Sequence, residues 1–161
     1  MPILFLSLGS NIDPAKNLRA CARLLRREFP EIAFSHVYET APRDREDQPA
    51  FLNAVARMET DQTPYDVSRC TQFIERKLGK RPPYPKGPRT IDIDLLFVTP
   101  PISSNSTLTL PHPRMHERRF VLEPLCELTD PDTKHPTLRR TWRELLRENM
   151  DQECLQTGLA L

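Results

Sequence analysis

Two aspartates, Asp92 and Asp94, stand one residue apart in the otherwise apolar run TIDIDLL. Residues i and i+2 of a strand project from the same face, roughly 7 Å apart along the chain. Ile91, Ile93 and Leu95 then face the core, and both carboxylates face away from it. Two carboxylates this close repel each other unless a cation lies between them, and Mg²⁺ or Mn²⁺ would also bring phosphate oxygens as further ligands. The pattern predicts a metal site for phosphate chemistry; the alternative is a solvated strand face that happens to carry acids.

Positive charge flanks the two aspartates along the chain. Arg89, three residues before Asp92, has the planar guanidinium that clamps a phosphate through two hydrogen bonds. The later segment LPHPRMHERRF adds four more candidates for polyphosphate, which are His112, Arg114, Arg118 and Arg119. His112 and His116 also have the spacing of a zinc pair on a helix, but Pro113 argues against a regular helix there and no cysteine pair is close. The pattern favours polyphosphate over zinc.

A second candidate site lies in the segment FLNAVARMET, which alternates as a strand does. One face carries small apolar side chains, namely Leu52, Ala54, Ala56 and Met58. Phe51 and Asn53 point the other way, and an aromatic ring beside an amide suits a flat heterocycle that stacks and forms hydrogen bonds. A core phenylalanine beside a surface asparagine is the alternative.

The elements that position these residues follow from hydrophobic periodicity. We predict strands at 3–8, at 32–40, at 51–60 and around the aspartates. Helices are predicted after the N-cap residues Asp13 and Thr63, each followed by proline, and a last amphipathic helix is marked by Leu138, Trp142, Leu145 and Leu146. The order strand, helix, strand, strand, helix, strand and then helices predicts an α+β fold, with helices on a mainly antiparallel sheet and a ferredoxin-like core.

Composition sets bounds on the class of protein. The 161 residues form about one domain, so we expect a single domain over 1–161. The net charge of +1 provides no field for nucleic acid or an anionic membrane, and no GxxxxGK[ST] loop occurs. No apolar run reaches the ~18 residues of a membrane span, and the start reads as a strand rather than a signal peptide. Four scattered cysteines indicate reduced thiols, which favours the cytoplasm or an organelle interior of similar redox poise.

Several blocks of the sequence together resemble a known family. The blocks, in order, are LSLGSN, YETAP, DQPAFLNAV, TQFIERKLG, GPRTIDIDLL and LPHPRMHERRFVLEPL. From about residue 3 to about residue 147 the chain resembles the 6-hydroxymethyl-7,8-dihydropterin pyrophosphokinases of folate biosynthesis, and the residues after 147 form a tail. The resemblance implies a three-layer αβα sandwich. It also implies transfer of the diphosphate of ATP to the pterin hydroxymethyl group, with release of AMP.

The resemblance further implies a role for each matching position. Asp92 and Asp94 would hold two Mg²⁺ ions, and Arg89 would contact phosphate, so these three are the expected catalytic residues. Positions expected at the pterin are Thr40, Pro42, Phe51, Asn53 and Phe120. Positions expected around ATP are Gln72, Glu75, Arg89, Thr109, His112 and Arg118. Lys80 and Arg81 join this ATP set because they lie in the basic loop beside the expected triphosphate.

The sequence departs from the family pattern in the loop before GPRT. Lys86 stands where a tryptophan is usual, Arg43 stands where an apolar residue is common, and the loop is short and rich in proline. We expect residues 80–87 to close as a lid over ATP and pterin, with a static loop as the alternative. Two other functions stay open, a two-metal phosphohydrolase or nuclease and a catalytically silent binding module. No nucleic acid, membrane or obligate protein partner is expected.

Overall fold

The computed structural model describes residues 1–41, 49–80, 90–102 and 108–161. Pro42, Arg43, Arg81, Lys86 and Arg89 lie outside these residues, as does all of the expected lid except Lys80. Within the described part of the chain, six strands form one sheet, in which every pair of neighbours is antiparallel. The strands are β1 (Ile3–Ser10), β2 (Ile32–Phe34), β3 (Tyr38–Thr40), β4 (Phe51–Glu59), β5 (Asp92–Thr99) and β6 (Leu155–Gln156).

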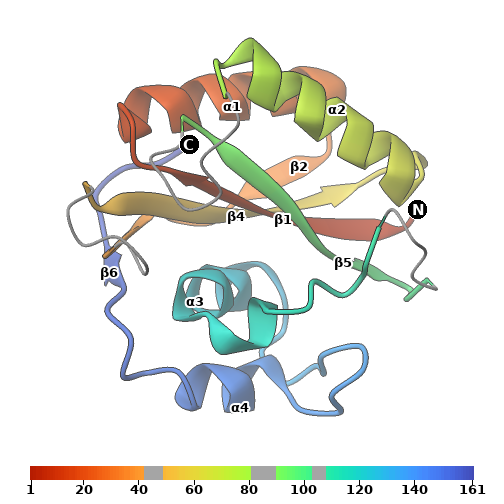
Figure 1. Ribbon diagram of the computed structural model, residues 1–161. Coiled ribbons are helices and arrows are strands. Elements are labelled where there is room, and N and C mark those ends of the chain that lie inside the picture. Colours follow the sequence, from red (N-terminus) through yellow and green to blue (C-terminus); the bar gives the residue numbers. More distant parts are fainter. Residues whose placement is uncertain (42–48, 81–89, 103–107) are drawn as a thin grey trace.

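Helices cover both faces of this sheet (Figure 1). One face carries α1 (Pro14–Glu28) and α2 (Pro64–Lys77). The other carries α3 (Arg119–Leu128), on which α4 (Trp142–Arg147) packs, together with a short 3₁₀ helix at Met115–Glu117. The strand order β5-β1-β4-β3, with a helix after β1 and another after β4, is that of a ferredoxin-like fold. The prediction of a three-layer αβα sandwich with a mainly antiparallel sheet is confirmed.

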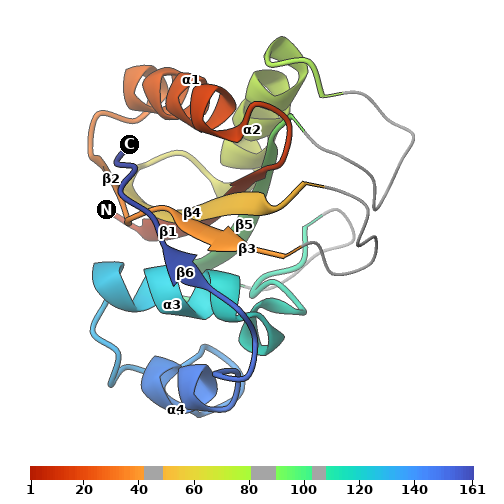
Figure 2. The same cartoon turned by 90° about the vertical axis from the view of Figure 1, so that its left-hand side faces the viewer.

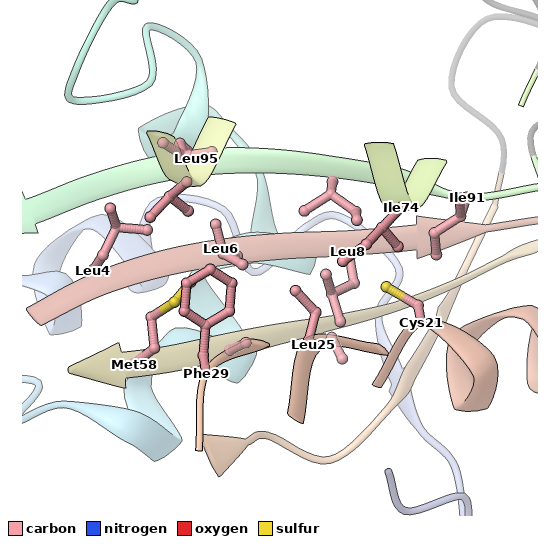
Figure 3. Close-up of a cluster of buried hydrophobic side chains, with 14 of the residues drawn as sticks. Leu4, Leu6, Leu8, Cys21, Leu25, Phe29, Met58, Ile74, Ile91 and Leu95 are labelled. Carbon is pink, nitrogen blue, oxygen red and sulfur yellow. The ribbon is translucent and has the colours of Figure 1, made fainter. Parts of the chain in front are cut away.

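Strand alternation divides the core into two clusters. Beneath α1 and α2 lie the side chains of Leu4, Leu6 and Leu8 from β1, packed with residues of β4, β5 and both helices (Figure 3). On the opposite face Phe5 of β1 stacks on Phe97 of β5, whose ring stacks in turn on Trp142 of α4. The core is therefore continuous on one face, and on the other it gathers where α3 and α4 cover the sheet.

The starts of the two long helices differ. Thr63 caps α2 as predicted, since its hydroxyl accepts a hydrogen bond from the Asp66 amide at 3.1 Å. Asp13 occupies the N-cap of α1, but it adopts a left-handed conformation with φ 40° and its side chain makes no capping hydrogen bond. The prediction is right about the position of this helix start and wrong about a side-chain cap.

Two predicted elements are shorter than expected. The strand at 32–40 is interrupted after β2, because the Ser35 hydroxyl accepts the hydrogen bond of the Val55 amide at 2.9 Å in place of a backbone carbonyl. The last helix begins at Trp142 rather than at Leu138, which is exposed and lies outside it. In both places a local side-chain pattern continued past the point where the backbone changes direction.

The tail after α4 belongs to the sheet. Its β6 pairs with β3, and the Thr157 amide donates a hydrogen bond to the Val37 carbonyl at 2.9 Å. Farther on, the Arg26 guanidinium of α1 donates to the Leu161 carbonyl at 2.8 Å. Figure 2 shows this segment running from α4 along the edge of the sheet to the α1 layer. Among the described helices, none is long and apolar enough to cross a membrane.

Candidate active site

The register of the three central strands aligns the two sites expected from the sequence. Gly9 of β1 pairs with Asn53 of β4 on one side and with Asp92 of β5 on the other. Directly opposed residues of antiparallel strands share a face, so the amide and the first carboxylate lie on the same side of the sheet. Neighbouring strands are 4.7–4.9 Å apart, which separates the two backbones by about 10 Å. This is the face that α3 covers farther along the strands.

Asp92 belongs to a compact group of charges at the start of β5. Lys80 Nζ lies 2.6 Å from Asp92 Oδ1 and 2.9 Å from Glu75 Oε2. Glu75 Oε2 also accepts the backbone amide of Ile93 at 2.9 Å, which ties α2 to the aspartate strand. Burial lowers the pKa of Lys80, but its hydrogen bonds to Asp92 and Glu75 outweigh burial and raise that pKa overall.

Asp94 lies in a field of charges from several elements. Desolvation by the surrounding protein raises the pKa of its carboxyl, and the charge of Asp92 raises it further. Both effects disfavour the charged form of Asp94, and a bound cation would relieve the repulsion between the two carboxylates. His112, Lys80 and Arg118 act on Asp94 in the opposite direction and lower the pKa of its carboxyl. Burial lowers the pKa of His112, although Asp94 raises it.

Asn53 is held by its neighbour on β3. Its Nδ2 donates a hydrogen bond of 2.8 Å to the hydroxyl of Thr40, and both side chains are buried. Because Nδ2 donates to Thr40, Oδ1 is turned away from Thr40. The predicted heterocycle site therefore contains an amide of defined orientation.

The two aromatic residues expected at this site are half-buried. Phe51 is the first residue of β4, two before Asn53 and on the same face. Phe120 lies in the first turn of α3, and the Arg118 guanidinium carbon is 5.6 Å from the centroid of its ring. Arg118 thus links the aromatic side of the site to the charge cluster.

Gln72 and Thr109 are the remaining described residues of the expected ATP set. Gln72 lies on α2 one turn before Glu75, is exposed, and contacts Ser68 at 3.5 Å. Thr109 is exposed in the segment that leads to His112. Neither residue makes a hydrogen bond to the acid cluster among the contacts of the described residues.

Reasoning from residue types alone missed one residue of β1, Gly9, and one residue just after that strand, Asn11. Gly9 lies between the amide and the acids, and the buried Asn11 donates a hydrogen bond from Nδ2 to the Pro49 carbonyl at 3.3 Å, just before β4. The only sequence signal for them is the block LSLGSN, since neither residue type suggests catalysis.

The donors at this site fit magnesium. Asp92, Asp94 and Glu75 offer hard carboxylate oxygens, and the Lys80 ammonium already occupies a cation position between two of them. No group of three or more His, Cys, Asp or Glu side chains with metal-binding geometry occurs in the described ranges. Mg²⁺ usually takes one or two protein carboxylates and completes its shell with phosphates and water.

The site thus combines two neighbouring carboxylates, several basic side chains and a buried amide on one α+β sandwich. A family model described as 7,8-dihydro-6-hydroxymethylpterin-pyrophosphokinase (HPPK) matches residues 5–130. The chain belongs to this family.

Individual relatives agree with the family assignment. The chain is 38% identical over 148 residues to the 2-amino-4-hydroxy-6-hydroxymethyldihydropteridine pyrophosphokinase of Bacillus subtilis, which covers 90% of this chain and 89% of the relative. It is 37% identical over 147 residues to the folic acid synthesis protein fol1 of Schizosaccharomyces pombe, covering 89% of this chain but only 20% of that protein. The Plasmodium falciparum HPPK-DHPS solved with pteroate shares the fold, with a TM-score of 0.74 at 16% identity, over 93% of this chain and 44% of that one.

Proposed function

We propose that this protein transfers the diphosphate of ATP to 6-hydroxymethyl-7,8-dihydropterin, giving the pterin diphosphate and AMP. The observation that carries the proposal is the alignment of Asn53, Gly9 and Asp92 across three strands. A ring held at the amide and a phosphate chain held at the acids would meet across about 10 Å. A bicyclic ring with a one-carbon arm is of comparable length.

On the acceptor side, Asn53 and Thr40 would hold the polar edge of the pterin through hydrogen bonds. Phe51 and Phe120 would stack on its faces, each stack worth about 0.5–1.5 kcal/mol beyond area burial. Pro42 completes the expected acceptor set. The effect is to hold the hydroxymethyl oxygen toward β5, which converts a bimolecular attack into a step between aligned groups.

On the nucleotide side, Asp92 and Asp94 would hold two Mg²⁺ ions. Bound there, the ions would neutralise charge that develops on the phosphates during transfer. The basic side chains of Lys80, Arg81, Arg89 and Arg118, together with the His112 imidazole, would orient the triphosphate, with Gln72, Glu75 and Thr109 around the rest of the nucleotide. The acceptor oxygen forms a bond to the β-phosphorus, the bond from that phosphorus to the oxygen of the α-phosphate breaks, and AMP leaves while the hydroxyl proton passes to solvent.

The test is one incubation with ATP, Mg²⁺ and the reduced hydroxymethyl pterin, scored for AMP and for pterin diphosphate. AMP that forms only when the pterin is present supports the transferase. Inorganic phosphate released without pterin, or cleaved nucleic acid, would identify a two-metal hydrolase instead. Binding of both ligands without any product would identify a silent binding module.

The setting of the reaction is part of the same proposal. We propose a single domain over 1–161 that works in the cytoplasm without an obligate protein partner, nucleic acid or membrane. The four cysteines, Cys21, Cys70, Cys126 and Cys154, are unpaired, which supports a reducing compartment.

A further inference from the structure

Gly9 is crowded on the side that faces the site. A Cβ built on this residue would lie 2.9 Å from Asn53 Oδ1, closer than real Cβ atoms approach a neighbour. The next nearest atoms are at 4.0 Å, so a single oxygen accounts for the conflict. The φ angle of Gly9 lies outside the left-handed region, and a side chain there would meet no backbone strain. Glycine is needed here because a Cβ would collide with the Asn53 side chain, and not because of the backbone conformation.

Asn53 has little freedom to yield that space. Its side chain is buried, with 4% of its surface exposed, and Nδ2 is committed to the Thr40 hydroxyl at 2.8 Å. Rotating the amide away from Gly9 would break this bond and leave a buried polar group unpaired, which is unfavourable. Thr40 therefore holds the Asn53 amide by a hydrogen bond, and Gly9 leaves room for that amide because it has no side chain.

We propose that Gly9 is a positioning residue for the acceptor substrate. By leaving room for Asn53 Oδ1 against the sheet, it keeps the carboxamide in the orientation that Thr40 sets, and it leaves the strip between the amide and Asp92 open. The identity of the acceptor as a pterin rests on the proposed function. The role of Gly9 is to hold Asn53, and it needs no contact with the reacting atoms.

The first test is the variant Gly9→Ala, with Gly158→Ala as its control. A Cβ at Gly158 meets no atom within 4 Å, so that variant makes the same chemical change without the conflict. We expect Gly9→Ala to weaken binding of a pterin analogue by tenfold or more and to raise the KM for the pterin. Binding of a non-hydrolysable ATP analogue should change by less than twofold. Gly158→Ala should leave both affinities unchanged.

The second test separates the contact from a general loss of packing. Asn53→Ala removes the oxygen that the new Cβ would meet, so adding Gly9→Ala to it should cause no further loss of pterin affinity and no further fall in melting temperature. This double variant keeps the test valid if Gly9→Ala alone folds poorly. Losses that add in full, or a Gly9→Ala protein that binds pterin as tightly as the native one, would overturn the role of Gly9. A native protein that neither binds the pterin analogue nor forms AMP would overturn the proposed function, and this role with it.

Discussion

The two faces of β1 differ along their length, and the difference shows how a core becomes a site. Toward α1 and α2 the strand presents Leu4, Leu6 and Leu8, all buried with at most 1% of their surface exposed. Toward α3 it presents Phe5, then Ser7, then Gly9, so the side chains shrink toward the site. The large end fills the space under α3 and α4, and the small end lies beside Asn53 and Asp92, where we propose that the substrates bind. In the proposed function, one strand serves packing on one face and substrate binding on the other.

Removing an acid from the site face should have the largest effect. We expect Asp94→Ala to lower turnover roughly 10³-fold, because loss of a ligand from a metal clamp costs several kcal/mol of transition-state stabilisation. The exposed side chain makes no core contact, so the melting temperature should stay near that of the native protein. AMP formation at saturating substrates is the measurement, and Asp61→Ala serves as a control that removes an exposed carboxylate elsewhere. Near-native turnover of Asp94→Ala would refute the metal assignment.

The opposite face should show the reverse pattern. Leu6 is fully buried beneath α1 and α2, and we expect Leu6→Ala to lower the free energy of unfolding by about 2–5 kcal/mol through lost burial and a cavity. The pterin KM of the molecules that remain folded should change little. Urea denaturation measures the first effect, and Leu155→Ala, at a leucine that is 56% exposed, is the matched control. A change in pterin KM without a loss of stability would contradict this division of labour between the faces.

On the face of the sheet that α3 and α4 cover, His135 should make the stability of the fold sensitive to acid. Burial, with a smaller contribution from His116, lowers the pKa of His135 from its ordinary value of 6.5 to about 4. Its Nδ1 accepts the amide hydrogens of Thr137 and Leu138, so a proton there would break both bonds. His135 also packs against Trp142, with ring centroids 5.5 Å apart.

Stability should fall with falling pH because the unfolded chain takes up the proton before the folded protein does. His135 takes up a proton near pH 6.5 in the unfolded chain and only near pH 4 in the folded protein. The stability that neutral His135 contributes is therefore fully present above pH 6.5 and is lost as the pH falls toward 4. We expect a loss of about 1–3 kcal/mol over that window. Melting temperatures of the native protein and of His135→Asn between pH 7 and 4 measure it, with the exposed His36→Asn as control. Equal pH dependence in the native protein and His135→Asn would exclude this histidine as the cause.

The smallest effect should come from the tail that borders the sheet. Arg26 donates to the Leu161 carbonyl and its guanidinium lies 4.7 Å from the centroid of Phe34. We expect Arg26→Ala to cost about 0.5–1.5 kcal/mol of unfolding free energy, as for one hydrogen bond at an exposed position. The neighbouring Arg27→Ala is the control. Chemical denaturation checks this value, and identical midpoints for the two variants would mean that the tail contributes nothing through this contact.

Much of the fold was predictable, because strand and helix periodicity is a local property of the chain. The alternation in FLNAVARMET separated the buried Ala54, Ala56 and Met58 from Asn53 correctly, and Thr63 announced the start of α2. The errors fell where a local pattern met a tertiary constraint. Ser35 interrupts a strand because its hydroxyl replaces a backbone acceptor. His135 is buried, with 4% of its surface exposed, although its largely polar neighbours in the sequence do not indicate a buried position.

The tail shows the same limit in another form. Leu155 and Gln156 form β6 only because β3 offers an unpaired edge, and neither residue stands in an alternating run that predicts a strand. The roles assigned to Pro42, Arg81 and Arg89, and the lid expected over 80–87 beyond Lys80, lie outside the described residues and stay predictions.

The sequence by itself determined that Asp92 and Asp94 share one face of a strand, because successive side chains alternate and no distant contact is needed to say so. It also placed an amide and an aromatic ring together on a second strand. Only the tertiary structure decided that Gly9 lies between these two sites, and that Lys80 joins Glu75 of α2 to Asp92. Strand register and the packing of a helix against a strand depend on interactions between residues tens of positions apart. A pattern within a short stretch of sequence does not include these interactions.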